Sequence, residues 1–208
     1  MEIPKEILSI IDRINKSEDN WKAIYMGVWG YYFQLKAKFE NTSEWNRPHK
    51  LGLPAFRRGY HEYTPNQLCS ILTSKDIEIT FEHLIILFSL FEELLNKSSE
   101  ILFGTELDTS QWRNMKKFFE EESTLDILSE ESMKELNLAK QTRNCYVHNG
   151  GKIDQIWLDS CNKIEEKSME LIGKNLEDGF QNLFHRIEEW HDLIIEATNK
   201  IKEKIESK

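Results

Sequence analysis

The longest apolar stretch of the chain, residues 76–103, constrains the fold most strongly. Its apolar side chains recur every three or four residues, which is the period of one face of an α-helix. The set comprises Ile77, Phe81, Leu84, Ile85, Phe88, Phe91, Leu94 and Leu95. Gly104 follows directly, and glycine ends helices without backbone strain. The pattern therefore predicts a central core helix over 76–103 against which other helices must pack.

The remainder of the chain favours the same kind of structure. Only 9 Gly and 4 Pro occur among 208 residues, which favours long helices over a β fold with many turns. Periodic apolar residues predict further helices over 3–16, 18–40, 65–72, 111–122, 129–149, 152–164 and 175–206. Ser17 is expected to cap the second of these, and 73–76 to form a turn. Residues 168–172 fit either a brief strand or a loop. We expect an all-α fold with a single domain over 1–208.

Residues 41–66 interrupt the helical pattern and predict a long ordered loop between the early helices. The segment carries four cations, Arg47, Lys50, Arg57 and Arg58. Interleaved aromatic residues are Trp45, Phe56, Tyr60 and Tyr63. Cations beside stacking aromatic rings are what a single-stranded RNA site requires. The alternative is a loop held down by its aromatic residues, with its charges in solvent.

Charge and cysteine content limit the class of protein. A net charge of −9 argues against a general nucleic-acid coat, although it is compatible with an enzyme that has a local basic pocket. Cys69, Cys145 and Cys161 form neither a CxxC pair nor a zinc pattern, so reduced thiols are expected. The N-terminus does not resemble a signal peptide, and no apolar run approaches the roughly 18 residues of a membrane span. We expect a cytoplasmic protein away from the membrane, with no cofactor and no metal.

A polar cluster lies at the end of the predicted helix over 129–149. Arg143, Asn144 and His148 occur within six residues, and the Asn-Gly-Gly sequence that follows should end the helix. At about 100° per residue, Asn144 and His148 lie on nearly one face, whereas Arg143 and His148 are about 140° apart. The long arginine side chain, or a second copy of the helix related by a two-fold axis, would bring the two groups together.

These residue types suit acid–base chemistry at a phosphodiester. The partial negative charge at a helix C-terminus favours imidazolium, so His148 is expected to exchange protons near neutral pH. A histidine can move the proton while an arginine stabilises charge on phosphate oxygens. The residues alone also allow a plainer interpretation, in which His148 caps the helix and Arg143 is a surface charge.

The motif resembles the Arg-x4–6-His signature of the HEPN superfamily. Residues 143–148 read Arg-Asn-Cys-Tyr-Val-His, which matches the Arg-polar-x3-His form of its ribonuclease members. The apolar stretch 81–95, with the acidic Glu92 near its end, is similar to a second helix of several HEPN families. The resemblance covers about 76–155 and implies a HEPN-like helical bundle acting as a homodimer. It further implies a metal-independent endoribonuclease of toxin or phage-defence type, cutting RNA such as tRNA or mRNA, with an antitoxin or defence-system partner.

The resemblance also implies a role for each site residue. His148 would act as general base or acid while the ribose 2′-hydroxyl attacks the adjacent phosphate. Arg143 would stabilise the phosphorane charge, and Asn144 would orient His148 or a phosphate oxygen. Glu92 would hold Arg143, because a carboxylate on a mostly buried helix needs a partner. Cys145 occupies a variable position of the motif and receives no catalytic role.

Two other functions are compatible with the same resemblance. Some HEPN proteins are non-catalytic dimerisation or interaction modules, and here such a module would belong to a defence complex. Others bind or receive nucleotides, in which case Tyr146 would be the residue to examine for modification. The intact Arg-Asn-x3-His sequence favours the nuclease.

Overall fold

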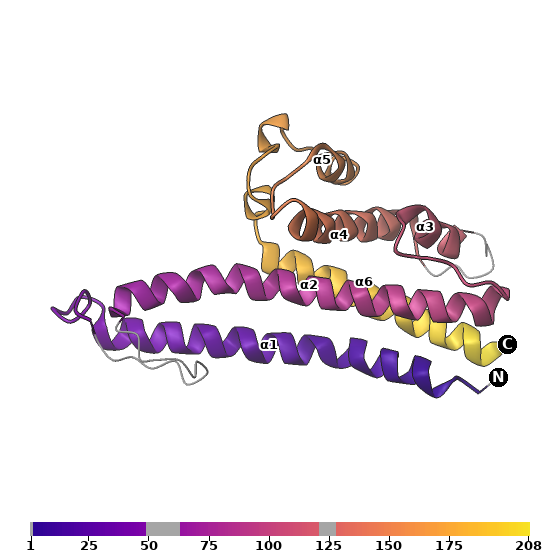
Figure 1. The fold of residues 1–208 in the computed structure, drawn as a ribbon, viewed down its shortest axis with the longest axis horizontal. Coiled ribbons are helices and arrows are strands. Elements are labelled where there is room, and N and C mark those ends of the chain that lie inside the picture. Colours follow the sequence, from indigo (N-terminus) through magenta and orange to yellow (C-terminus); the bar gives the residue numbers. More distant parts are fainter. Residues whose placement is uncertain (1, 49–62, 121–127) are drawn as a thin grey trace. The chain divides into compact units, whose positions relative to one another are not determined.

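The computed structural model describes residues 2–48, 63–120 and 128–208, and these residues form an all-α structure (Figure 1). The α-helices are α1 (Lys5–Phe39), α2 (Pro65–Phe103), α3 (Trp112–Glu120), α4 (Glu130–His148), α5 (Gln155–Cys161) and α6 (Leu183–Ser207). Two 3₁₀ helices, η1 (Met169–Leu171) and η2 (Leu176–Gly179), precede α6. The prediction of an all-α fold is confirmed. No helix within the described ranges is both long and apolar enough to cross a membrane.

Two expected interruptions of the first helices are wrong. Ser17 lies inside α1, where its Oγ donates a hydrogen bond to the Ile14 carbonyl at 2.7 Å instead of capping a new helix. Helix α2 likewise continues through 73–76, with Ser74 Oγ donating to the Ile71 carbonyl at 2.8 Å. Serine hydroxyls bond the preceding helical turn in this way, so a polar stretch does not by itself end a helix.

The segment before the last helix is also less regular than expected. The ambiguous residues 168–172 contain η1 rather than a strand. The helix expected from residue 175 is instead η2, followed by extended backbone at Phe180. Helix α6 starts only at Leu183, where the Asn182 side chain accepts a hydrogen bond from the His185 backbone N–H. The helix therefore begins after its capping residue, Asn182, although the apolar pattern in the sequence begins earlier.

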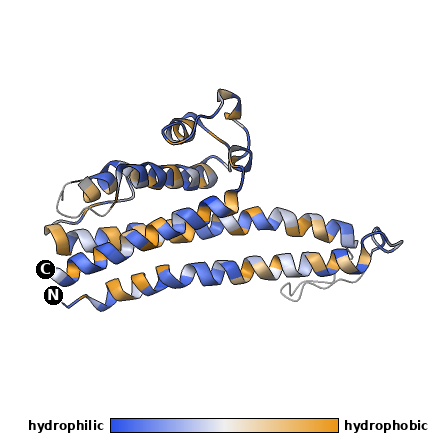
Figure 2. Cartoon of the chain, turned by 180° about the vertical axis from the view of Figure 1, so that it is seen from behind, coloured by the Kyte–Doolittle hydropathy of each residue, from blue (hydrophilic) through white to orange (hydrophobic). Residues whose placement is uncertain are grey.

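The chain divides into two compact units, one of residues 1–18 and 81–208 and the other of residues 19–80. The expected single domain over 1–208 stays a prediction. In the larger unit, α4 packs against α3, α5, α6 and η2. Its largest fully buried side chains include Phe81, Phe88, Phe91, Trp157 and Trp190. Figure 2 shows apolar and polar residues alternating along the helices, as expected where one face of each helix is buried.

The smaller unit has its own core. Leu35, Leu68, Cys69 and Leu72 form a buried cluster, surrounded by partly buried aromatic residues. Two of these, Trp45 and Tyr63, come from the predicted loop 41–66. Both edges of that loop are therefore anchored by aromatic packing, which is the arrangement expected of a loop held down on a core. The middle of the loop, residues 49–62, lies outside the described residues.

Trp157 connects four elements of the larger unit. Its indole Nε1–H donates to Thr142 Oγ1 on α4 at 2.9 Å. Its ring meets Phe180 edge-on at 5.5 Å between centroids, and Phe180 meets Trp190 of α6 at 5.8 Å. The backbone of Gly179 in η2 packs closely against the same indole. A Cβ atom built on Gly179 would be only 2.6 Å from Trp157 Cη2. The absence of a side chain at residue 179 is therefore required for this packing.

Replacing Gly179 by alanine should destabilise the protein. The added methyl group would overlap a fully buried and rigid indole ring, so we expect Gly179→Ala to cost about 1–3 kcal/mol. The free energy of unfolding in urea measures this. The matched control is Gly30→Ala, because Gly30 lies inside α1 with nothing within 4 Å of its built Cβ. That substitution should be neutral or stabilising, and an equal loss in both variants would contradict the steric explanation.

Candidate active site at the end of α4

Helix α4 carries the Arg-Asn-x3-His motif and ends where the sequence predicts. It begins after Ser129, whose side chain accepts a hydrogen bond from the Ser132 backbone N–H at 3.1 Å. At its other end the Gly151 backbone N–H donates to the Cys145 carbonyl at 3.1 Å. Gly150 and Gly151 have φ angles of 59° and 74°, a region that favours glycine. His148 is therefore the last residue of the helix, as predicted.

The turn after α4 is held by a carboxylate that the sequence analysis did not single out. Asp154 Oδ2 accepts a hydrogen bond from Asn149 Nδ2 at 2.5 Å. Its other oxygen accepts from the Trp157 backbone N–H at 2.8 Å and so caps α5. This double contact fixes the end of α4 relative to α5. An Asp three residues before a helical tryptophan is a recognisable capping signal.

The buried side of the motif helix is occupied by packing residues. Tyr146 stacks on Phe81 of α2, with ring centroids 4.4 Å apart and planes inclined by 19°. Cys145 is buried, and burial raises the pKa of its thiol to about 11. The thiol is therefore protonated near neutral pH and is a poor nucleophile. Arg143 and Asn144 are left half-buried, and His148 is exposed.

Arg143 has a neutral partner and no anionic one within the described ranges. Its Nη1 donates to the Asn144 side-chain oxygen at 3.1 Å. Its Nε is buried and makes no hydrogen bond to any described residue. Since no described carboxylate forms an ion pair with it, the guanidinium keeps both its charge and unused donors. A phosphate group would supply the missing negative charge.

The geometry changes the expectation for Asn144. Its side-chain oxygen accepts from Arg143, and no hydrogen bond joins the side chains of Asn144 and His148 in the part of the chain that the structure describes. Asn144 therefore orients the arginine beside it rather than the histidine one turn later. The side chain of His148 is exposed and makes no hydrogen bond or ion pair to another described residue, so its ring is accessible to a ligand.

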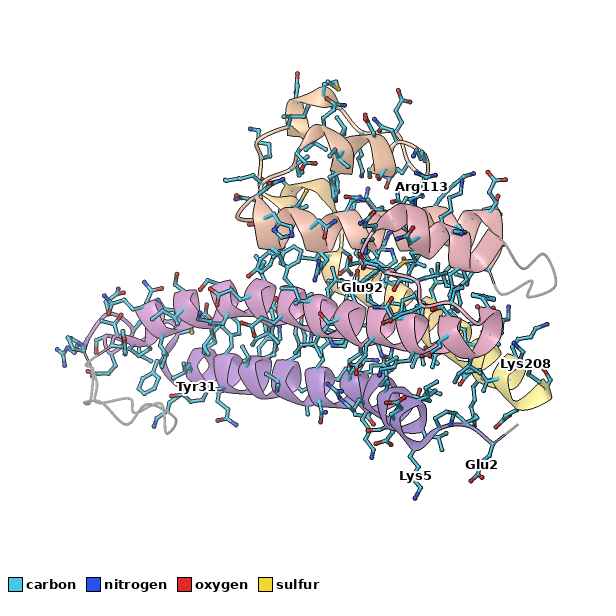
Figure 3. The ribbon with its side chains drawn as sticks, turned by 45° about the vertical axis from the view of Figure 1, so that its right-hand side comes forward. Glu2, Lys5, Tyr31, Glu92, Arg113 and Lys208 are labelled. Atoms are coloured by element: carbon cyan, nitrogen blue, oxygen red, sulfur yellow. The ribbon has the colours of Figure 1, made fainter. Side chains whose placement is uncertain are left out.

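The expectation that Glu92 holds Arg143 is wrong. Glu92 forms an ion pair with Lys140, one turn earlier on α4, and the two side chains are only 13% and 3% exposed. Figure 3 shows Glu92 on the side of α2 that faces α4. Lys140 lies four residues after the buried Leu136, so it shares the inward face of α4. That spacing was the signal available in the sequence, and it identifies Lys140 rather than Arg143 as the buried cation.

The cations of the predicted RNA-binding loop are mostly outside the described residues. Arg47 is described, is exposed, and forms an ion pair with Glu44 at 2.8 Å. Lys50, Arg57 and Arg58 lie outside the described residues. RNA binding by this loop stays a prediction.

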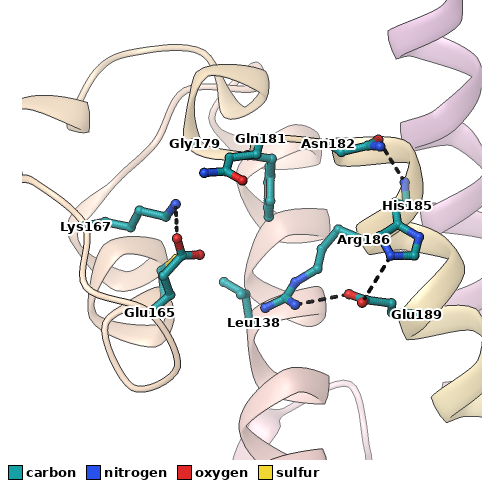
Figure 4. Close-up of a pocket in the computed structure, with 11 residues that line it drawn as sticks. Leu138, Glu165, Lys167, Gly179, Gln181, Asn182, His185, Arg186 and Glu189 are labelled. Carbon is teal, nitrogen blue, oxygen red and sulfur yellow. Dashed lines mark hydrogen bonds and ion pairs between the residues drawn. The ribbon is translucent and has the colours of Figure 1, made fainter.

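A cavity of about 210 Å³ lies beside the start of α6 in the larger unit (Figure 4). The lysine and the arginine that line this cavity both form ion pairs with glutamates. Lys167 pairs with Glu165 at 3.0 Å, and Arg186 pairs with Glu135 at 2.8 Å and Glu189 at 3.1 Å. The cavity therefore has no positive excess to attract phosphate, and no residue of the Arg-Asn-x3-His motif lines it. The end of α4 is the better candidate for an active site.

Glu92→Gln should destabilise the protein, because it leaves the Lys140 ammonium buried without its counter-charge. Breaking a buried ion pair typically costs about 3 kcal/mol or more, which urea unfolding would measure. The adjacent Glu93 provides a matched control, since it pairs with Arg13 at 3.7 Å with half-exposed side chains. Glu93→Gln should cost less than about 1 kcal/mol. A Glu92→Gln variant as stable as Glu93→Gln would contradict a structural role for the pair.

Comparison with protein-family models, curated proteins and solved structures found no match for this chain.

Proposed function

We propose that this chain is a HEPN-type, metal-independent endoribonuclease whose site forms between two copies of α4. One observation carries the proposal. The guanidinium of Arg143 has no carboxylate partner among the described residues, at the same helix end as an exposed histidine. Charged groups that are fully removed from water are normally paired, and the Nε atom of Arg143 is buried without a partner among the described residues. An unneutralised guanidinium beside an accessible imidazole suits a substrate that brings its own negative charge.

The chemistry follows from the two side chains. A neutral His148 takes the proton from the ribose 2′-hydroxyl, whose oxygen then attacks the adjacent phosphorus. Arg143 donates hydrogen bonds to the phosphorane oxygens, where negative charge accumulates in the transition state. The bond to the 5′-oxygen breaks, and an imidazolium, from this subunit or its mate, protonates the leaving group. The products are a 2′,3′-cyclic phosphate and a 5′-hydroxyl.

Helix geometry favours a site shared between two copies. Arg143 and His148 are about 140° apart around a single helix, so a two-fold axis is the simplest way to direct both at one phosphate. Val147, between them in sequence, is 44% exposed although it is apolar. A single exposed valine is ordinary on a protein surface, so Val147 marks a position where a contact between two copies can be tested and is not evidence for one.

The same resemblance allows a second candidate function, a non-catalytic HEPN-like homodimerisation module. In that case Arg143 and His148 would form hydrogen bonds across the interface and would not act on RNA. A nucleotide-transfer role at Tyr146 receives less support, because its ring is stacked on Phe81 and half-buried.

RNA cleavage separates the first two functions. We expect the wild-type chain to cleave tRNA or mRNA in the presence of EDTA and to leave 2′,3′-cyclic phosphate ends. His148→Ala should reduce the cleavage rate by about 10²–10⁴-fold through loss of proton transfer, and Arg143→Ala should lower it comparably. His185→Ala is the control, because His185 is an exposed histidine on α6 away from the motif. An inactive wild type, or a fully active His148→Ala variant, would leave only the dimerisation module.

The dimer itself is tested by placing a charge at the exposed valine. Val147→Asp should convert the dimer to a monomer, because two like charges would face each other across a two-fold interface. Light scattering measures the change in mass, and RNA cleavage should fall with it although Arg143 and His148 are intact. Ile156→Asp is the matched control, since Ile156 is an exposed apolar residue of α5 outside the motif. A monomeric wild type that cleaves RNA would contradict the shared site.

A further inference from the structure

One face of α1 in the smaller unit is apolar and exposed. Met26 and Phe33 are 69% and 60% exposed, although both are large apolar side chains. They lie on the same side of the helix, because residues seven apart are separated by nearly two full turns. The rest of this face consists of exposed residues that are small or uncharged, namely Ala23, Gly27, Gly30, Gln34 and Ala37. The face therefore carries no charge over about four helical turns, or roughly 21 Å.

The spacing of these five residues is that of a surface that packs against another helix. They follow one another at intervals of four, three, four and three, which is the seam repeat of paired helices. Nothing lies within 4 Å of a Cβ built on Gly27 or Gly30, so a second helix can approach the backbone closely there. The opposite side of α1 is already buried, with Trp21 and Leu35 only 3% and 4% exposed.

The exposed face is complementary to a copy of itself. A two-fold axis through Gly30 and perpendicular to the helix makes the second helix antiparallel, and residues equally distant from Gly30 then lie opposite each other. Ala23 and Ala37 are each seven residues from Gly30, so alanine meets alanine at both ends. The axis also sets each edge of the face against the same edge of its mate. Met26 of one copy therefore meets Phe33 of the other.

The charges at the two ends of this face are complementary in the same arrangement. Lys22 and Glu40 lie on the edge that carries the two large apolar side chains, eight residues before Gly30 and ten after it. The antiparallel arrangement brings the lysine of one copy near the glutamate of the other, twice in each pair. Glu40 already pairs with Lys36 at 3.0 Å, but both side chains are partly exposed, so the glutamate can be shared between two cations.

We propose that this face of α1 binds the same face of a second copy, antiparallel and with Gly30 on the two-fold axis. The face is roughly 21 Å long and about 10 Å wide, so the contact is smaller than the roughly 1,200 Å² of a stable interface. It therefore forms at high protein concentration and is not populated in the dilute protein used for urea unfolding or for the Val147→Asp test. Together with a dimer through α4, it would link dimers into larger assemblies.

Cysteine cross-linking tests this arrangement, because all three native cysteines are buried. In concentrated full-length protein with a mild thiol oxidant, Gly30→Cys should form disulfide-linked dimers, since residues on the axis lie within the roughly 7 Å between Cα atoms that a disulfide can span. Gln34→Cys is the matched control on the same face. Its mate is about 12 Å away along the helix, so cross-linking should be about tenfold slower or more. Ala23→Cys and Ala37→Cys should cross-link when the two variants are mixed, and only slowly when each is alone.

Substitutions of the surrounding face test the contact independently of register. Phe33→Asp should slow the cross-linking of Gly30→Cys by about tenfold or more, because a carboxylate would be buried in each half of the contact. Lys22→Glu should slow it about two- to fivefold, and the further substitution Glu40→Lys should restore it. Ile86→Asp is the control, since Ile86 is 55% exposed on α2 outside this face, and the rate should not change.

Three outcomes would overturn the proposal. Equal rates for Gly30→Cys and Gln34→Cys would indicate random collisions. Absence of Gly30→Cys cross-linking is expected if a different protein, or another segment of the chain, covers this face. Fast cross-linking of Ala23→Cys alone would indicate a parallel pair. None of these results bears on RNA cleavage, because Arg143 and His148 are unchanged in every variant.

Discussion

The ion pair between Glu92 and Lys140 is the contact on which the candidate active site depends. Both side chains are almost fully removed from water, and a charge in that environment is retained only with its counter-charge. The pair therefore sets where α4 lies along α2. Because the pair occupies Glu92, which the sequence offered to Arg143, the guanidinium one turn later has Asn144 as its side-chain partner among the described residues. The structural cation and the candidate catalytic cation are thus different residues of one helix.

Much of the fold was predictable because helical periodicity is a strong signal over long segments. The end of α4 at His148 followed from Asn149, Gly150 and Gly151, whose backbone preferences leave few alternatives. The breaks expected at Ser17 and at 73–76 were wrong for one reason: a serine or threonine is compatible with a cap and with the interior of a helix. Only tertiary packing decides between the two, and a local pattern does not contain that information.

The candidate site was predictable in its residues but not in their partners. Spacing placed Asn144 near His148 and Arg143 apart from it, yet Asn144 contacts Arg143, since a long side chain folds back on its neighbour more readily than helix angles suggest. The choice of Lys140 over Arg143 as the partner of Glu92 depends on where two helices cross. The point where two helices cross is a tertiary property, and its one trace in the sequence here is that Lys140 lies four residues after Leu136, on the inward face of the helix.

The neutral partner of Arg143 suits a site that must bind a charged substrate. Asn144 orients the guanidinium through its amide oxygen and leaves the positive charge in place. A carboxylate in the same position would bind the guanidinium more strongly, but it would compete with a phosphate for the same donors. A neutral partner therefore fixes the direction of the arginine side chain without neutralising it.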